Sequence, residues 1–317
     1  MCSCAASEAA ITKSYATPLA FESALKAYAK DCVRQDGGTV NAVMRGFYFQ
    51  RLTARVFSAD PDRWLLKGGQ ALLVRYPSGA RLSSDIDFQH LDDDLDAALA
   101  ALRAAAATDL GDHLSFVPSS SSTHGVQDGG VRQGFDVHVG INRRASVSVD
   151  LVVRRNITAP PQVVSLHPRP GVPWPTDWPK VRLYPVVDHI ADKVCAMYEW
   201  RRDAPSSRFR DLADIILMTQ RETIDAAAAH HALHTEAAHR RSLGRAELRL
   251  PQKFEMPHES WRSGYAKAAT DVAGLHGCGT WDAAFTQVDA FLTPLLGTSF
   301  VGTWHPDQQE WRTEGRA

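Results

Sequence analysis

Residues 65–89, LLKGGQALLVRYPSGARLSSDIDFQ, constrain the fold and chemistry of this chain more than any other stretch. A short apolar run at 64–66 is typical of a buried strand, and it meets a Lys-Gly-Gly sequence in which two residues carry no Cβ atom. A helix is expected at 70–76. A strand that runs through two glycines into a helix start leaves N–H groups pointing at one place, where the helix dipole also favours negative charge. The stretch therefore predicts a phosphate-binding loop.

Two carboxylates follow this loop, in the sequence SDIDF at 84–88. The alternation of polar and apolar residues is typical of a strand with one apolar face, so Asp85 and Asp87 are expected to point to the same side. Two carboxylates about 7 Å apart on one strand face repel each other unless water or cations lie between them. Mg²⁺ prefers oxygen ligands of this kind. A pair of Mg²⁺ ions that bridges them to a triphosphate would give nucleotidyl transfer.

Either motif alone is common, because Gly-Gly usually marks a turn and Asp-x-Asp usually marks a solvated strand end. Their combination in the order strand, Gly-Gly, helix, turn and Asp-x-Asp strand is far more specific, and it resembles the signature of polymerase-β-type nucleotidyltransferases. LKGGQALLVRY with RLSSDIDF resembles the AbiEii/MenT-type toxins in particular. In that family the signature binds NTP and Mg²⁺. The residues expected at the nucleotide and its phosphates are Lys67, Gly68, Gly69, Ser83 and Ser84.

A third carboxylate is expected on one of two further strands, at 135–141 and 145–153, which a turn at 142–144 would join. Asp150 lies in the second strand, on the face opposite Val147, Val149 and Leu151. A carboxylate there costs free energy to desolvate unless it is paired or bound to a metal, so Asp150 is either a site residue or lies at a wet sheet edge. The family resemblance implies a third metal ligand from a neighbouring strand. Asp150 is the best match by order, and Asp136 is the alternative.

Other segments of the first half have a structural interpretation. Helical spacing predicts helices at 18–33 and 41–57, and the aromatic residues of the second are expected in the core. The acidic residues at 92–96 are expected at the start of a helix, where the dipole favours them, rather than at a metal. Residues 118–130 are expected to form a flexible loop by composition.

The domain organisation follows from a proline-rich stretch. Seven prolines between residues 160 and 179 favour an ordered linker over a helix. We expect residues 1–16 to be disordered, 17–178 to form a polymerase-β-like nucleotidyltransferase lobe with a mixed sheet, and 179–317 to form a mainly helical lobe. The predicted fold class is therefore α+β.

Two motifs of the C-terminal lobe bear on function. Residues 186–200 form an amphipathic pattern with Lys193 at the margin of the apolar side, where a lysine is usually a surface residue. IADKVCAM nevertheless resembles the AbiEii motif in which a helix lysine reaches the nucleotide phosphates. RFRDLAD at 208–214 resembles the family's Arg-Asp-Leu-x-Asp motif. The resemblance makes Asp211 a catalytic residue that orients Lys193 or the nucleotide and places Arg208 at the nucleotide, whereas position alone makes Asp211 a helix-start charge paired with Arg208.

A local basic segment is the candidate for RNA contact, because a net charge of −1 gives no overall field that attracts nucleic acid. Residues 230–253 hold five Lys or Arg against two Glu. This segment is either a solvated helix face or a patch that positions an RNA backbone. The arginines in question are Arg240, Arg241 and Arg245.

The sequence as a whole predicts a Mg²⁺-dependent nucleotidyltransferase in which Asp85, Asp87 and Asp150 hold two metal ions. By resemblance it is a toxin that transfers NMP from an NTP to the 3′ acceptor end of tRNA, blocks translation and is neutralised by a cognate antitoxin. The alternatives are a protein or small-molecule hydroxyl as acceptor, and a catalytically inert nucleotide-binding protein. The absence of a long apolar run and of a secretory signal predicts a cytoplasmic protein.

Overall fold

The computed structural model describes residues 14–123, 130–153, 157–169, 171–175, 177–201, 204–244, 246–298 and 300–313. Their contacts divide the chain into two compact units. The first unit comprises Met1–Trp64, Ser84–Arg154 and Val163–Arg182, and the second comprises Leu65–Ser83, Arg155–Gln162 and Leu183–Ala317. The glycine loop thus clusters with C-terminal residues. A division into folding domains near residue 179 stays a prediction.

A mixed seven-stranded sheet confirms the predicted α+β class, with the strand order β3-β4-β5-β2-β1-β7-β6. β4 pairs antiparallel with both β3 and β5, whereas β5 runs parallel to β2 and β1 runs parallel to β7. The strands are β1 (Trp64–Lys67), β2 (Ile86–His90), β3 (Leu114–Ser122), β4 (Val131–Val139), β5 (Asn142–Val152), β6 (Gln162–Ser165) and β7 (Lys180–Leu183).

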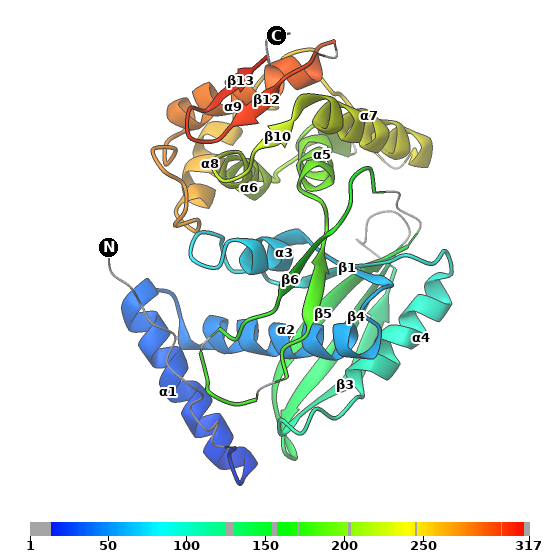
Figure 1. Cartoon of the computed structure of the whole chain (residues 1–317), viewed down its shortest axis with the longest axis vertical. Helices are drawn as coiled ribbons and strands as arrows, with labels where there is room; N and C mark the ends of the chain where they lie inside the picture. Colours follow the sequence, from blue (N-terminus) through cyan, green and yellow to red (C-terminus); the bar gives the residue numbers. More distant parts are fainter. Residues whose placement is uncertain are drawn as a thin grey trace. The chain divides into compact units, whose positions relative to one another are not determined.

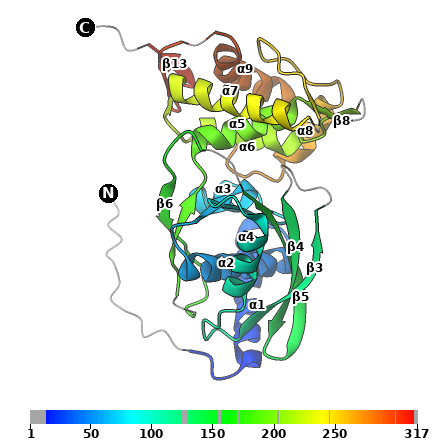
Figure 2. The same cartoon turned by 90° about the vertical axis from the view of Figure 1, so that its right-hand side faces the viewer.

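The first unit has three helices with sequence-encoded starts: α1 (Pro18–Asp36), α2 (Val40–Ala59) and α4 (Leu95–Ala106). Thr17 and Thr39 cap α1 and α2 by accepting a backbone N–H in the first turn. Asp94 caps α4 in the same way, which confirms the helix-start interpretation for that aspartate. Helices α2 and α4 lie on one face of strands β3, β4 and β5 (Figure 2).

Aromatic side chains form the core of the first unit beneath α2. Phe57 and Trp64 both contact Phe88 edge-on, at centroid distances of 6.2 and 5.8 Å. These contacts confirm that aromatic residues of the second helix are core residues. Arg51 and Arg55, also on α2, bind the buried carboxylate of Asp112 at 2.7 and 2.6 Å. Both guanidinium groups and the backbone N–H of Leu114 donate to this carboxylate, so its burial is tolerated.

Two local predictions in this unit are wrong. The serine-rich segment expected to form a loop from 118 continues β3 as far as Ser122, and residues 124–129 lie outside the described part of the chain. Pairing with β4 outweighs the weak strand preference of serine, and Gly134 allows Ser120 to approach closely. The turn between β4 and β5 lies at residues 140–141, where Gly140 has a φ of 58°. Only glycine adopts that conformation readily.

The second unit is mainly helical, as predicted for the C-terminal part (Figure 1). Its helices are α3 (Gly68–Arg75), α5 (Val186–Met197), α6 (Phe209–Thr219), α7 (Ala226–Leu243), α8 (Trp261–Ala269) and α9 (Trp281–Leu296). Short strands between these helices form two small sheets. One sheet contains β8 (Glu199–Arg201), β9 (Ala204–Pro205) and β11 (Glu247–Leu248), and the other contains β10 (Ile224–Asp225), β12 (Thr303–His305) and β13 (Glu310–Arg312). Each strand is too short to show alternation in the sequence.

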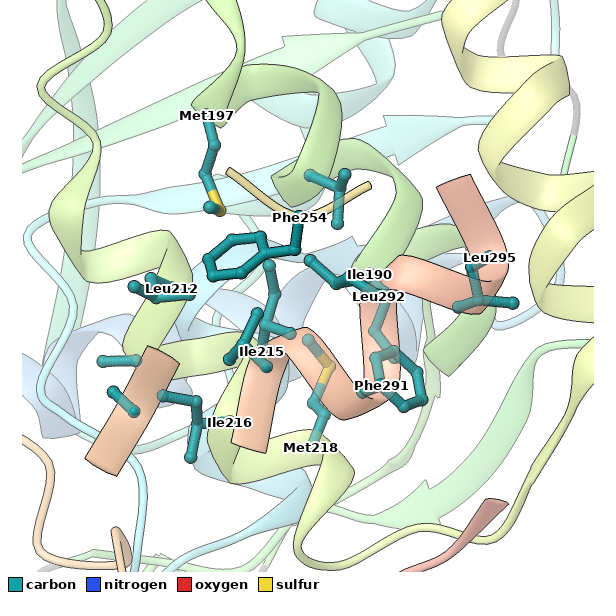
Figure 3. Packing of buried hydrophobic residues seen from close by; sticks show 14 of the residues in the cluster. Ile190, Met197, Leu212, Ile215, Ile216, Met218, Phe254, Phe291, Leu292 and Leu295 are labelled. Atoms are coloured by element: carbon teal, nitrogen blue, oxygen red, sulfur yellow. The ribbon is translucent and has the colours of Figure 1, made fainter. Parts of the chain in front are cut away.

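Apolar side chains of α5, α6 and α9 meet around Phe254 in the core of the second unit (Figure 3). Leu212, Ile215 and Phe291 are fully buried there. The amphipathic faces of these helices therefore pack against one another and fix the positions of the polar residues that they carry. Among the described helices, none combines the length and the apolar character needed to cross a membrane.

Candidate active site

The predicted glycine loop lies between β1 and α3 in the second unit. α3 begins at Gly68, two residues before the predicted start, and Gly68 has a φ of 59° that favours glycine. Gly69 packs against Ser83, since a Cβ atom at Gly69 would lie 2.8 Å from Ser83 Oγ. The hydroxyl of Ser83 thus lies beside the N-terminal turn of α3, where backbone N–H groups have no partner within the helix. This arrangement can bind an anion.

Replacing Gly69 by alanine is expected to destabilise the protein by about 1–3 kcal/mol, the usual effect of overpacking. The reason is that Ser83 Cβ would also lie only 3.0 Å from the new methyl group. The double variant Gly69→Ala/Ser83→Gly should recover most of this loss. Gly46→Ala in α2 is the matched control, because nothing lies within 4 Å of a Cβ atom there. Urea unfolding measures the free energy of unfolding of all three variants. Equal losses of stability in Gly69→Ala and in Gly69→Ala/Ser83→Gly would contradict the contact.

Lys67 precedes the loop and is buried. Its ammonium lies 4.2 Å from the ring centroid of Tyr184, a cation–π contact that holds the side chain below the loop. Asp188 on α5 lies in the same region and accepts hydrogen bonds from the N–H and hydroxyl of Thr158. Burial raises the pKa of Asp188 above its ordinary value, against the opposing effects of Thr158 and of the Lys67 charge. Lys67 therefore supplies buried positive charge next to the glycine loop.

Lys193 lies buried between α5 and α6, and the prediction that it lies at a surface margin is wrong. Its Nζ is 2.8 Å from Asp211 Oδ1 and 2.7 Å from Asp214 Oδ2. Burial alone would lower the pKa of Lys193, but the two carboxylates raise it above its ordinary value. Lys193 is therefore a buried ammonium, and the structure brings it to Asp211 as the family motif implies.

Two arginines extend this buried ion pair. Arg208 donates to Asp211 from one side, while Arg81 forms a fork to Asp214 with Nε and Nη2 at 3.2 and 2.9 Å. Burial acts to raise the pKa of Asp211, yet Arg208 and Lys193 hold it well below its usual value. Charges alternate along the series Arg81, Asp214, Lys193, Asp211 and Arg208, which we call the charge series. Sequence reasoning missed Arg81, because its partner lies 133 positions away.

The three predicted carboxylates lie in the first unit. Asp87 of β2 and Asp150 of β5 are directly opposite each other in neighbouring parallel strands. Asp85 precedes β2, and it is partly exposed like Asp87, whereas Ile86 is fully buried. This burial pattern matches the predicted alternation. The alternative ligand, Asp136, lies on β4 opposite Ser146 and binds Arg143 at 2.9 Å, so the register favours Asp150.

Arg132 of β4 is a second residue that sequence reasoning missed. Its guanidinium donates to both oxygens of Asp150 at 2.6 Å and lies 4.0 Å from Asp85. Hydrogen bonding to Asp150, and the charges of Asp150, Asp85 and Asp87, raise the pKa of Arg132. Among the described residues, no group of three His, Cys, Asp or Glu side chains is arranged so that it could hold a metal ion. Three carboxylates nevertheless act on one cationic group, so these oxygen donors fit a hard divalent cation.

The basic segment at 230–253 differs from its predicted role. Arg240 is buried, and its guanidinium binds Asp192 at 2.8 Å, Glu236 at 2.6 Å and Glu199 at 2.5 Å. Each of the three guanidinium nitrogens of Arg240 binds one of these carboxylates. The prediction that Arg240 contacts an RNA backbone is therefore wrong. Arg241 is exposed on α7 and stays a candidate. Arg245 lies outside the described residues.

Comparisons with known proteins found a matching family model and similar solved structures. The family model described as nucleotidyl transferase AbiEii toxin, type IV toxin–antitoxin system, matches residues 50–287. The MenT4 nucleotidyltransferase toxin of Mycobacterium tuberculosis H37Rv is similar in structure, with a TM-score of 0.52 and 17% identity over 86% of this chain and 93% of that chain. JHP933 of Helicobacter pylori gives a TM-score of 0.38 and 15% identity over 73% and 93%. No curated protein matches the sequence.

Proposed function

The chain belongs to the AbiEii family of nucleotidyltransferase toxins of type IV toxin–antitoxin systems, and from this premise we propose that it transfers NMP to tRNA. The donor is an NTP, the acceptor is the 3′ end of the tRNA, and the loss of usable tRNA blocks translation. A cognate antitoxin neutralises this activity. The observation that carries the chemistry is the pair formed by Asp87 and Asp150 on neighbouring strands. The acceptor and the antitoxin are proposed from the family resemblance.

One group of residues is proposed to bind metal, and another is proposed to bind the phosphates of the NTP. Asp85, Asp87 and Asp150 would hold two Mg²⁺ ions, which when bound neutralise the triphosphate and make the acceptor hydroxyl more acidic. Asp150 would accept the proton of that hydroxyl at a carboxylate oxygen. The N–H groups of Gly68 and Gly69 would bind the β- and γ-phosphates, so that pyrophosphate can leave. Lys67 and Lys193 would add positive charge, and Ser83, Ser84, Arg208 and Asp211 are also proposed to act on the nucleotide.

Replacing Arg132 by glutamine is expected to raise the affinity for Mn²⁺, a spectroscopic substitute for Mg²⁺, by up to about fivefold. The guanidinium of Arg132 is bound to the Asp150 carboxylate, so a metal ion must displace it. A partly exposed ion pair of this kind contributes up to about 1 kcal/mol of interaction free energy. Titration of nucleotide-free protein followed by electron paramagnetic resonance measures the change, with Arg143→Gln as the control on the same sheet. Unchanged Mn²⁺ affinity in Arg132→Gln would show that the arginine does not compete with metal. Equal binding by wild type and Asp87→Asn would remove the metal assignment itself.

The acceptor is tested with α-labelled NTPs, Mg²⁺, total RNA and total protein in one incubation. We expect label on tRNA, and none on tRNA whose 3′ diol has been oxidised with periodate, because that treatment destroys the acceptor hydroxyl. Label on protein or on a small molecule instead would favour the other acceptors considered for this chemistry. The absence of label on any component, with each of the four NTPs, would contradict transfer.

A further inference from the structure

Arg81 lies over the glycine loop. Its Nη1 is 3.7 Å from the position that a Cβ atom would take at Gly69, and Ser83 lies at the same point at 2.8 Å. Both residues therefore lie beside the N-terminal turn of α3. The side chain of Arg81 is only 13% exposed, so most of its surface is already removed from water.

The position of Arg81 is fixed by contacts with helices of the second unit. Asp214, which is fully buried on α6, receives the Arg81 fork and the Lys193 ammonium together. The segment before Arg81 is anchored as well. Tyr76 donates to Glu222 at 2.7 Å, and the N–H of Gly274 donates to the carbonyl of Gly79 at 3.0 Å. The guanidinium is thus held in one orientation before any ligand binds.

The charge series alternates cations and carboxylates and ends on an arginine at each side. It contains three cations, Arg81, Lys193 and Arg208, and two carboxylates, Asp211 and Asp214. Lys67 adds a further buried cation near the loop. Arg81 and Lys67 thus bring two cationic side chains to the region of the N-terminal turn of α3, where N–H groups and the helix dipole also favour an anion.

We propose that Arg81 is a phosphate ligand of the nucleotide and that Asp214 is the positioning residue that holds it against the glycine loop. This proposal rests on the proposed function, because it takes the triphosphate of an NTP as the anion. A guanidinium presents a planar fork, so one edge can be held by a carboxylate while another edge faces a phosphate. Lysine cannot replace it, since an ammonium offers a single point of charge.

Calorimetric titration with inorganic tripolyphosphate, with and without Mg²⁺, tests this role independently of transfer. Arg81→Gln is expected to weaken binding by at least about tenfold, the usual effect of losing a charge-assisted hydrogen bond. Arg81→Lys should recover little of the loss. Arg221→Gln is the matched control, because Arg221 is an exposed arginine of the same unit that contacts His276. It should bind tripolyphosphate like the wild type.

Asp214→Asn separates positioning from bulk charge. Removal of a negative charge should tighten anion binding if only net charge mattered, whereas loss of the anchor should weaken it if Asp214 positions Arg81. We expect weaker binding, measured on protein whose circular dichroism and thermal midpoint show that it is folded. Arg81→Lys, which leaves Asp214 intact, serves where the asparagine variant does not fold.

The outcomes distinguish this proposal from the proposed function. Tripolyphosphate affinity that is unchanged in Arg81→Gln, or undetectable in wild type, would overturn the role of Arg81 while leaving NMP transfer to be measured separately. Weaker binding in Arg81→Gln from a protein that transfers no NMP would support the anion site and contradict the proposed function.

Discussion

Replacement of Asp87 by asparagine is expected to reduce NMP transfer at least about a thousandfold, because a metal-bound transition state loses several kcal/mol of charge stabilisation and about 1.4 kcal/mol corresponds to tenfold. Asp87 lies opposite Asp150 in the sheet register and is partly exposed. Removing one of two repelling carboxylates opens no cavity, so the fold should remain intact. Incorporation of α-labelled NMP measures the rate, and calorimetry measures the midpoint of thermal unfolding.

Asp136→Asn is the discriminating variant for this prediction. Asp136 was the alternative third carboxylate, but it lies on β4 and binds Arg143. It should keep transfer within about threefold of wild type, as expected for a surface ion pair away from the chemistry. Transfer at the wild-type rate by Asp87→Asn, or a larger loss in Asp136→Asn, would contradict the assignment of the metal ligands.

Replacement of Lys193 by methionine is expected to destabilise the protein by about 3–5 kcal/mol, because it leaves two buried carboxylates without their cation. Methionine keeps most of the volume of the lysine stem, so the effect reports charge rather than a cavity. Lys193→Arg should recover only part, since a planar fork does not occupy the place of a compact ammonium between Asp211 and Asp214. Urea unfolding at pH 7 measures the free energy of each variant.

The difference in free energy of unfolding between wild type and Lys193→Met should depend on pH, which gives a second test. The folded-state pKa of Asp211 lies well below its ordinary value of 3.8, with Arg208 and Lys193 opposing the effect of burial. A carboxyl with a depressed folded pKa stabilises the protein above its unfolded pKa, and this contribution is lost as the pH falls toward the folded value. The gap between wild type and Lys193→Met should therefore be largest near neutral pH and shrink below about pH 4.

Lys267→Met is the matched control for Lys193, because Lys267 is exposed on a helix of the same unit. Its effect should stay within about 0.5 kcal/mol, as for most surface substitutions. An equally small effect for Lys193→Met, or a gap that does not change with pH, would mean that the buried ion pairs contribute little to stability.

The glycine loop and the Asp-x-Asp strand could be predicted because their signals are local. Glycine spacing and polar–apolar alternation within 25 residues specify a strand, a helix start and a second strand. The burial of Lys193 was not visible, since its periodicity places it at a helix margin while its partners lie 18 and 21 positions later. Long-range packing of α5 on α6 decides its environment.

The arginines show the same limit. Arg240 belongs to a basic run that suggests an exposed patch, but it is buried among carboxylates that come from α5, β8 and α7. Arg132 lies outside the motifs that predicted metal and phosphate binding, and Arg81 lies within RLSSDIDF but received no role from the sequence. Their roles become visible only when the sheet register and the helix packing place Asp150 and Asp214 beside them.

Nucleotidyl transfer is tested most directly by the position of the label that reaches the acceptor. Wild-type protein is incubated with tRNA, Mg²⁺ and an NTP labelled at either the α- or the γ-phosphate. The proposed chemistry predicts that the α-label becomes attached to the tRNA while the γ-label is released in pyrophosphate, and that Asp87→Asn does neither. Attachment of the γ-label to the acceptor, or release of inorganic phosphate without attached α-label, would contradict it.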